Sequence, residues 1–314
     1  MIVIFGPLSI DVHLHAQKLP HGETPQDADK HHIFYGGKTA AQAIAAARAG
    51  AKVTVLGTVG GDEYGTRIIE MLNKENVITS GIGMATTPTG LMVTTHDTGR
   101  QRQSITSHGA NQTSPLSLID KNFFNEKMIV LVQTGMDVAE NLKILTMAKE
   151  SGAMTMMNLA PYIDLSQKML DLLDYLIVNH EEAEKLAAKL GLKVEKNAFQ
   201  LAQGLSQQGS LNCIITLGAQ GCIGVTRDNT GWSVATLPVE DKILDRNGAE
   251  DSYCGTLAAG IQGGLPLARA MKRACIAASL TCAKPGMIEA FPSKTDIDNR
   301  MNDAKDPEQQ KLQA

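Results

Sequence analysis

Short apolar runs alternate with longer amphipathic stretches along most of the chain. The short runs have the length and the aliphatic content of buried strands, and they lie at residues 2–5, 53–56, 129–132, 154–158, 175–178 and 213–217. The longer stretches repeat apolar side chains at helical spacing, at residues 39–49, 64–74, 138–151, 181–190 and 198–208. This alternation predicts an α/β fold with a mainly parallel central sheet flanked by helices on both faces.

Two segments break this alternation. Residues 11–35 are polar and rich in histidine, and residues 90–108 alternate apolar and polar positions around Asp97-Thr98-Gly99, as a hairpin does. We expect them to form a small β-lid over the mouth of a ligand cleft, within one domain that spans residues 1–297. The remaining residues, 298–314, are charged and weakly apolar, so a frayed tail is expected there.

Composition narrows the class of protein. The chain has 314 residues, of which 43% are hydrophobic and 20% charged, which indicates a packed globule. Its net charge of −4 argues against nucleic acid as the main partner. Without a secretory leader or an apolar segment of about 18 residues, a cytoplasmic protein that does not enter a membrane is expected.

Cysteine and histidine give no sign of a metal site. The five cysteines stand singly within apolar stretches, so each is expected to be a buried, reduced thiol. The histidines gather at His13, His15, His21, His31 and His32, but none are paired four residues apart on a predicted helix. They are interpreted as lid surface.

The run Asp245-Arg246-Asn247-Gly248-Ala249-Glu250-Asp251, just before a helix-like stretch at residues 252–261, carries the clearest chemical signal. Small residues there leave the first N–H groups of the helix uncovered, so Gly248, Ala249 and Glu250 would offer backbone donors to an anion. An acid on the first turn, Asp251, could then accept a proton from a hydroxyl that attacks a bound phosphate. The alternative is ordinary helix capping.

Four further segments, together with the 245–251 run, resemble in order and spacing the signatures of the ribokinase-like (PfkB) family of sugar and nucleoside kinases. The resemblance spans residues 4–296 and rests on Gly36-Gly37-Lys38-Thr39-Ala40-Ala41-Gln42-Ala43, Gly60-Gly61-Asp62-Glu63-Tyr64-Gly65, Asn179-His180-Glu181-Glu182 and Thr216-Leu217-Gly218-Ala219-Gln220-Gly221. It implies a three-layer fold with a β-lid, ATP and Mg²⁺ as cofactors, and a small carbohydrate or nucleoside as substrate. It also leaves open a homodimer through the lid.

The resemblance also implies which residues bind the nucleotide. Asn179, Thr216, Gly218 and Gly221 lie at predicted strand ends, where ligands of such folds collect, and would bind the nucleotide. Glu182 would help to hold Mg²⁺ through water. The alternatives are a helix cap for Asn179 and Glu182, and plain turn geometry for the glycines.

On the substrate side, the resemblance assigns Asp11, Gly36, Gly37 and Lys38 to the acceptor, since a carboxylate can accept hydrogen bonds from two adjacent hydroxyls. The alternative for Asp11 is a surface charge. A loop that contains Gly286, with Asp245 and Asn247, corresponds to a family site for a monovalent cation such as K⁺.

Several residues depart from the family pattern. Glu250 replaces the second glycine of Gly-Ala-Gly-Asp, which would strain the backbone if that position needs a positive φ. A carboxylate ~5 Å from the γ-phosphate would cost about 3 kcal/mol at an effective dielectric of ~20, on the order of a hundredfold in rate, unless it turns outward. Arg246, which replaces threonine, could pair with Glu250.

Departures on the acceptor side concern Ser9, Thr39 and Ala41, which replace Asn, Gly and Asn. A site that loses amides for sugar hydroxyls favours an acceptor other than ribose, such as another sugar, a sugar phosphate or a nucleoside. Arg100 or Arg102 in the lid could suit a phosphorylated acceptor.

The sequence therefore predicts an ATP-dependent kinase with Asp251 as base. A regulatory protein that binds ligand without turnover is the alternative, because of Glu250. A dinucleotide-dependent oxidoreductase is disfavoured, since Gly6-Pro7-Leu8-Ser9 follows the first strand in place of a Gly-x-Gly-x-x-Gly run.

Overall fold

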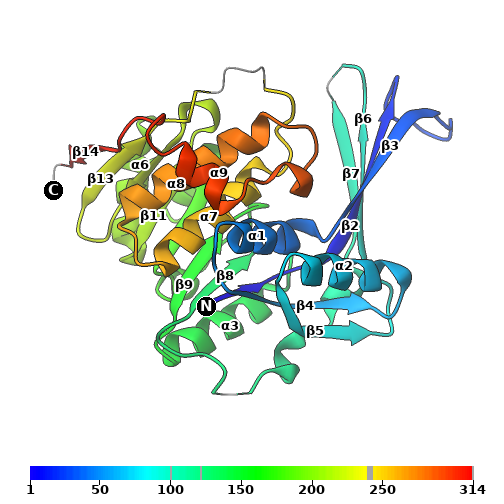
Figure 1. The fold of residues 1–314 in the computed structure, drawn as a ribbon, viewed down its shortest axis with the longest axis horizontal. Helices are drawn as coiled ribbons and strands as arrows, with labels where there is room; N and C mark the ends of the chain where they lie inside the picture. The colour runs from blue at the N-terminus through cyan, green and yellow to red at the C-terminus, as the bar shows by residue number, and fades with distance from the viewer. Residues whose placement is uncertain (100, 121, 239–242, 313–314) are drawn as a thin grey trace.

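The computed structural model describes residues 1–99, 101–120, 122–238 and 243–312, which form two sheets. The larger sheet has ten strands in the order β14-β13-β12-β11-β10-β9-β8-β1-β4-β5, and the smaller has four in the order β3-β2-β6-β7. Figure 1 shows the smaller sheet standing away from the main body as a narrow upright ribbon.

Seven strands of the larger sheet are parallel, and three antiparallel strands complete one edge. The parallel strands are β1 (Ile2–Phe5), β4 (Val53–Gly60), β5 (Ile78–Ala85), β8 (Ile129–Gln133), β9 (Met154–Asn158), β10 (Tyr175–Asn179) and β11 (Asn212–Thr216). The antiparallel strands are β12 (Cys222–Val225), β13 (Thr230–Val234) and β14 (Glu308–Lys311).

Helices cover both faces of this sheet, which makes three layers (Figure 1). Ile2 and Ile4 pack in one core cluster with α1 (Gly37–Arg48), α7 (Ala249–Gln262) and α8 (Leu267–Cys282). Val3 and Phe5 pack in a second cluster on the opposite face, with α3 (Val138–Glu150), α5 (His180–Lys189) and α6 (Ala198–Gly209). The remaining helices are α2 (Glu63–Lys74), α4 (Gln167–Leu170) and α9 (Lys294–Asn299).

The strands and helices that the pattern predicted are confirmed to within one or two residues at each end, except that β4 continues to Gly60 and α7, expected at residues 252–261, already begins at Ala249. The continuous apolar runs are explained by burial on both faces, since successive side chains of a strand point to opposite cores. All five cysteines are free thiols, and four of them are buried.

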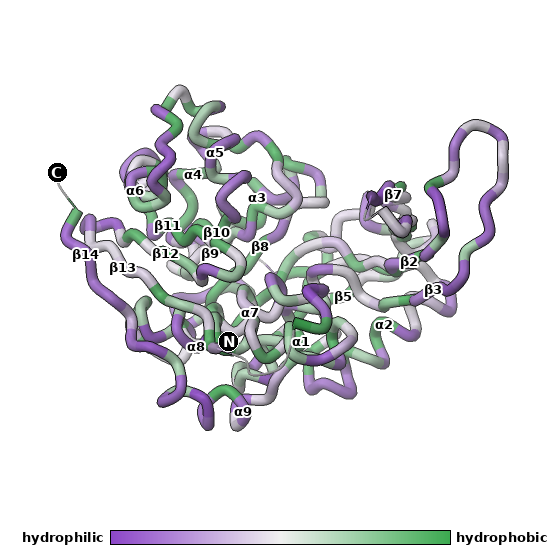
Figure 2. Tube along the Cα trace, turned by 90° about the horizontal axis from the view of Figure 1, so that it is seen from above, coloured by the Kyte–Doolittle hydropathy of each residue, from purple (hydrophilic) through white to green (hydrophobic). Residues whose placement is uncertain are grey.

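The two segments outside the alternation form the smaller sheet. It consists of β2 (Ser9–Ala16), β3 (Ala28–Tyr35), β6 (Gly90–His96) and β7 (Arg102–Ser107), with β2 and β6 parallel and the other pairs antiparallel. Hydrophilic residues prevail along it, in contrast to the main body (Figure 2). We call this sheet the lid from here on.

The C-terminal segment is a correction to the sequence expectation. Residues 308–311, expected within a frayed tail, form β14 and pair with β13, with Trp232 opposite Gln309. Backbone hydrogen bonds to an open sheet edge need no apolar side chains, so polar composition did not reveal this strand. Lys272, buried on α8, also binds Asp306 at 2.8 Å, which ties down the chain before β14.

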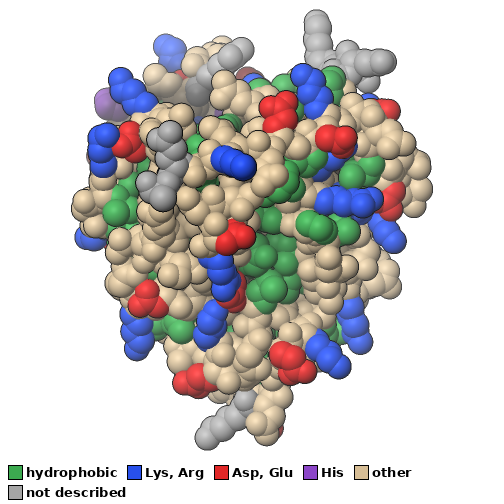
Figure 3. Space-filling view, turned by 90° about the vertical axis from the view of Figure 1, so that its left-hand side faces the viewer, with side chains coloured by type: hydrophobic (Ala, Val, Ile, Leu, Met, Phe, Trp, Pro, Cys, Tyr) green, Lys and Arg blue, Asp and Glu red, His purple; other side chains and the backbone are tan. Residues whose placement is uncertain are grey.

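Within the described residues, no helix is long and apolar enough to cross a membrane. On the face shown in Figure 3, basic and acidic side chains are interspersed around a central group of hydrophobic ones. That face therefore has no single-sign basic patch of the kind that binds a phosphate backbone.

Candidate active site

Helix α7 begins with uncovered backbone donors. Its N-cap, Gly248, has φ 74 and ψ −4 and provides no side-chain cap. Ala249 donates a long 3.3 Å bond to the carbonyl of Arg246, whereas the N–H groups of Gly248, Glu250 and Asp251 find no acceptor among the described residues. Three free amides at the positive end of a helix form a site for an anion.

Asp251 lies on the first turn of α7 and is 4% exposed. Its Oδ1 accepts a hydrogen bond of 3.0 Å from Nε2 of Gln42 and lies 3.6 Å from Nζ of Lys38. Burial raises the pKa of Asp251, Lys38 opposes this, and the nearby Glu250 adds to it. The result is a carboxylate with increased affinity for a proton, as a general base requires.

Lys38, near the start of α1, lies between two carboxylates. Its Nζ is 3.5 Å from Oε1 of Glu250 and 3.6 Å from Oδ1 of Asp251. Burial alone would lower the pKa of Lys38, but Asp251 and Glu250 outweigh it and the pKa is raised. Lys38 is therefore a stable cation beside the anion site.

The structure bears on three expectations about Glu250: its backbone strain, the direction of its carboxylate and its pairing with Arg246. The positive φ belongs to Gly248, while Glu250 is an ordinary helical residue, so the expected backbone strain is absent. Its carboxylate turns inward, because Asn158 donates to its Oε1 at 3.0 Å and Lys38 lies beside it. The pairing with Arg246 was wrong, since in the described part of the chain the ion-pair partner of Glu250 is Lys38.

A cleft of about 370 Å³ opens beside these groups and is lined by all four residues expected to bind the nucleotide, Asn179, Thr216, Gly218 and Gly221. Arg246, Ala249 and Glu250 from the 245–251 run also line it, but the sequence did not indicate the part of its wall that comes from α8 and from the residues after β13. Further lining residues include Thr236, Leu237, Tyr253, Ala278, Ser279 and Cys282. The amphipathic pattern of residues 267–282 was the sequence signal that could have revealed α8, and with it this part of the wall.

A second hollow, of about 660 Å³, lies between β13 and α8 and is lined by residues such as Trp232 and Lys272. It contains none of the candidate residues. The smaller cleft is therefore the one that bears on the chemistry.

Asn179 and Glu182 form a capping box at the start of α5, which was the alternative interpretation for this pair. Asn179 Oδ1 accepts from the amide of Glu182 at 2.9 Å, and Glu182 Oε2 accepts from the amide of Asn179 at 2.8 Å. The second carboxylate oxygen of Glu182 remains without a donor among the described residues. Burial raises the pKa of Glu182, the bond from Asn179 opposes this, and Glu250 adds to it.

The carboxyl group of Glu182 therefore keeps one oxygen that no described residue engages. No group of three or more metal-ligating side chains occurs in the described ranges. Mg²⁺ usually keeps several waters and binds through few carboxylates and substrate phosphates, so the residues present fit an ion that arrives with a nucleotide.

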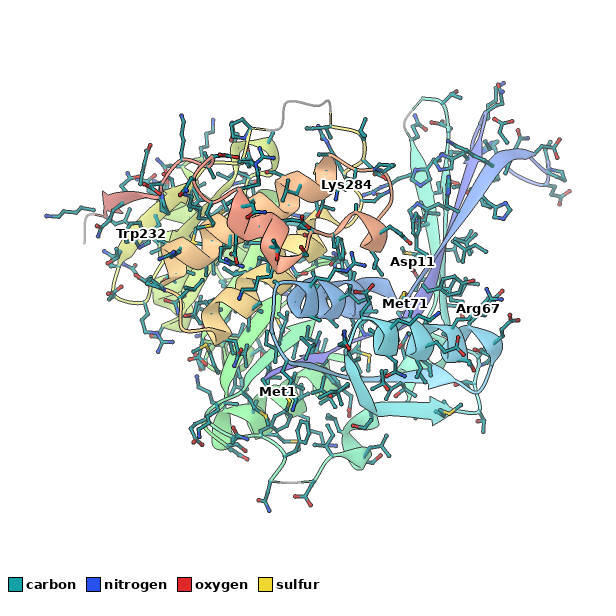
Figure 4. All side chains as sticks on the ribbon, viewed as in Figure 1. Met1, Asp11, Arg67, Met71, Trp232 and Lys284 are labelled. Atoms are coloured by element: carbon teal, nitrogen blue, oxygen red, sulfur yellow. The ribbon has the colours of Figure 1, made fainter. Side chains whose placement is uncertain are left out.

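Asp11 lies at the base of the lid, where β2 meets the main body (Figure 4). It is 9% exposed and accepts a 3.1 Å hydrogen bond from Ser9 Oγ. Burial raises the pKa of Asp11 to about 6, against the bond from Ser9 and with a contribution from Asp251. The charges of Asp251 and Lys38 both act on this pKa, so the three groups lie in the same part of the molecule.

Gly36 and Gly37 connect the lid to α1 with φ of 107 and 62. A Cβ on Gly37 would lie 2.6 Å from Ser9 Oγ. Only glycine therefore lets the backbone at residue 37 lie this close to Ser9, which is hydrogen-bonded to Asp11. Asp11, Gly36 and Gly37, which were expected to bind the substrate, therefore lie next to one another.

The loops expected to hold a monovalent cation lie side by side, since Leu244 donates to the carbonyl of Cys282 at 2.9 Å. The Asp245 carboxylate accepts from the amide of Asn247 at 3.0 Å, and Gly286 has φ 99. The geometry brings the two loops together without showing a set of cation ligands.

Several histidines of the lid contact one another through their rings. The ring of His96 stacks between those of His13 and His15, with ring centroids 5.1 and 4.9 Å apart, on the sheet face that carries Asp11. Arg102 begins β7 opposite His96 and is exposed, whereas Arg100 lies outside the described residues.

The fold and this site define a kinase of the ribokinase type, and comparison with known proteins agrees. Residues 1–294 match the pfkB family carbohydrate kinase model, and the chain belongs to this family. It is 25% identical over 305 residues to the ribokinase of Lactococcus lactis, covering 96% of this chain and 97% of that protein.

Solved structures show the same fold. The ribokinase of Thermotoga maritima superposes with a TM-score of 0.85 at 25% identity, covering 96% of this chain and 99% of that one. A ribokinase from Cryptococcus neoformans, in complex with ADP, has a TM-score of 0.81 at 25% identity, covering 95% and 99%. The predicted ribokinase-like fold is confirmed.

Proposed function

We propose that this protein transfers the γ-phosphoryl group of ATP to a hydroxyl of a small sugar, sugar phosphate or nucleoside. One observation carries the proposal: the buried carboxylate of Asp251 stands beside the free amides of α7 and next to Lys38. The cleft lined by Asn179 and Thr216 also contains Glu250, next to this point, and the charges of Asp251 and Lys38 act on Asp11. Base, anion site and two ligand regions therefore converge.

In the reaction, Asp251 would accept the proton of the acceptor hydroxyl as the hydroxyl oxygen attacks the γ-phosphorus, while the bond from the γ-phosphorus to the β,γ-bridging oxygen breaks and ADP leaves. The amides of Gly248, Glu250 and Asp251 donate to phosphoryl oxygens, where negative charge develops. Lys38 adds a fixed positive charge. Gln42 holds the carboxylate of Asp251 by its hydrogen bond.

The nucleotide would occupy the cleft, with its base against Leu237, Tyr253 and Ala278 and its phosphates toward Gly248. This proposal is supported by the ADP found in the Cryptococcus relative. Mg²⁺ would be held near Glu182 through water and would neutralise phosphate charge. A monovalent cation beside Asp245, Asn247 and Gly286 would steady the same anion site.

The acceptor would lie against Asp11, Gly36, Gly37 and Lys38, beneath the lid, which would exclude water from the transfer. Thr39 is fully buried and donates to Gln133, so it offers nothing to a sugar hydroxyl. Together with Ser9 and Ala41, this favours an acceptor other than ribose. A homodimer through the lid and a cytoplasmic location remain part of the proposal.

One observation favours a second candidate, a regulatory protein that binds ligand with little turnover. The Glu250 carboxylate lies inside the site, 3.5 Å from Lys38, where it adds negative charge beside the phosphate position. Repulsion of the γ-phosphate would then slow the reaction.

The test is ADP release measured across a panel of sugars, sugar phosphates and nucleosides. We expect turnover with at least one acceptor, its loss in Asp251→Asn, and no loss of nucleotide binding in that variant. Turnover that survives in Asp251→Asn removes Asp251 from the mechanism. A large gain in Glu250→Gly, with negligible wild-type turnover, favours the regulatory candidate.

A further inference from the structure

Two positions where the family signatures have glycine, Thr39 and Glu250, are joined in this protein by one chain of hydrogen bonds, buried except for its last bond, to Glu250, which is part-buried. Thr39 Oγ1 donates to Oε1 of Gln133 at 2.8 Å, and Nε2 of Gln133 donates to Oε1 of Gln42 at 2.8 Å. Nε2 of Gln42 donates to Asn158 Oδ1 at 3.0 Å, and Asn158 Nδ2 donates to Glu250 Oε1 at 3.0 Å. The chain also passes through the base, since Gln42 donates to Asp251.

The direction of this chain is fixed. The carboxylates of Asp251 and Glu250 only accept, so Gln42 and Asn158 must turn their nitrogens toward them and their oxygens toward the preceding groups. Asn158 is 1% exposed, and its Oδ1 is taken by Gln42, which leaves its Nδ2 aimed at Glu250. Flipping the Asn158 amide would break both bonds inside a buried network.

The position of Glu250 in the helix makes this contact important. Glu250 is the second residue after the N-cap Gly248, and a carboxylate there is attracted to the free amides of its own helix start. Those amides are the donors that the phosphate needs. A carboxylate held elsewhere leaves them free.

We propose that Asn158 is a positioning residue that holds the Glu250 carboxylate against Lys38 and away from the amides of α7. This rests on the proposed function and deepens it. The site keeps its extra carboxylate paired with a cation and a donor, so a nucleoside triphosphate binds in spite of Glu250. Asn158 acts through Glu250 and does not itself touch the transferred group.

The experiment is calorimetric binding of AMP-PNP and of ADP, which differ by the γ-phosphoryl group, with Mg²⁺ present. In Asn158→Asp, which keeps the acceptor for Gln42 but removes the donor to Glu250, AMP-PNP affinity should fall on the order of tenfold. ADP affinity should fall less. In a Glu250→Gly background, Asn158→Asp should have less than a third of that effect on AMP-PNP, because there is no carboxylate to release.

A donor and acceptor exchange provides the matched control. In Asn158→Asp with Glu250→Gln, the glutamine amide can donate to the new carboxylate, and the summed charge of the pair is unchanged. We expect this double variant to recover most of the AMP-PNP affinity that Asn158→Asp loses. Thermal unfolding of each variant checks the fold, and Asn158→Ser replaces Asn158→Asp if the latter does not fold.

The proposal is overturned if Asn158→Asp, or its serine replacement, weakens AMP-PNP equally with and without Glu250, or weakens ADP as much as AMP-PNP. Wild-type affinity in the single variant would overturn it as well. These outcomes are separate from the proposed function, which fails if Asp251→Asn still turns over or if no acceptor is phosphorylated.

Discussion

The side-chain amide of Gln42 donates a hydrogen bond of 3.0 Å to Oδ1 of Asp251. Gln42 lies on α1 and is fully buried, whereas Asp251 lies on the first turn of α7, 209 residues later. The two helices approach closely, because a Cβ on Gly255 would lie only 2.4 Å from the backbone oxygen of Gln42. The orientation of the base is therefore set by a neighbouring helix.

Replacing Gln42 by leucine should lower kcat by about tenfold, since a hydrogen bond to a charged group is lost in a buried site. The bond from Gln42 lowers the pKa of Asp251, so its removal raises that pKa further. The acidic limb of kcat/KM should then move to higher pH. Steady-state kinetics across pH measure both effects.

The matched control for this change is Gln200→Leu, which alters an exposed glutamine on α6, remote from the site. It should leave both kcat and the pH profile as in the wild type. A Gln42→Leu enzyme whose kcat falls without any displacement of the acidic limb would contradict a role in positioning the base.

We expect the binding of the acceptor substrate to depend on pH through the protonation of Asp11. Its pKa is raised to about 6, chiefly by burial, so the carboxylate becomes protonated as the pH falls through 6. A protonated acid accepts fewer hydrogen bonds from hydroxyls. The KM for the acceptor should rise below pH 6, and Asp11→Asn should have a higher KM without this inflection. A wild-type KM that stays flat from pH 5 to 8 would refute the assignment.

Asp11 also affects folding stability, which should rise as the pH falls, whereas acceptor binding should weaken. Because the pKa of Asp11 is higher in the folded than in the unfolded protein, the folded state binds more protons between pH 3.8 and about 6. This contribution is complete below pH 3.8 and is lost as the pH rises through 6, at most about 3 kcal/mol. Asp11→Asn should therefore gain stability relative to the wild type above pH 6, in denaturant titrations at pH 5 and 7.5.

Gly248 has a positive φ, and the space where a side chain would project from it is filled by Phe291. Alanine there would meet Phe291 Cε1 at 2.7 Å, whereas Gly264, with φ 79, has nothing within 4 Å of an added Cβ. Gly264→Ala should cost about 1 kcal/mol of unfolding free energy from strain alone, and Gly248→Ala about 1 to 3 kcal/mol more. Equal losses in chemical denaturation would mean that Phe291 moves aside freely.

The sequence predicts the sheet well because local pattern is sufficient there. Residues 2–5 and 175–178 are continuous apolar runs, and burial on both faces requires that composition. Strands β5, β12, β13 and β14 escaped prediction, because β12 is a buried run of only four residues, β5 and β13 are partly buried, and β14 is exposed. The lid was recognised by its departure from the helical pattern.

The site was predictable only in part. Asp251, Lys38 and Asp11 lie in motifs whose residue types carry the chemistry, and the fold brings them together. Gln133 and Asn158 have no local signal, because their partners in the network lie 91 to 116 residues away. The inward turn of Glu250 depends on Asn158, so no pattern near Glu250 could have revealed it.

The C-terminal strand should contribute stability but not ligand affinity. Deleting residues 307–314 removes β14 and leaves β13 as an open edge, while Thr236 and Leu237, which line the cleft, keep their other contacts. Loss of about 1 kcal/mol of pairing would lower Tm by about 1 to 2 °C in a chain of this length. Differential scanning calorimetry and AMP-PNP titration test this, and an unchanged Tm would mean that β14 adds nothing to the folded state.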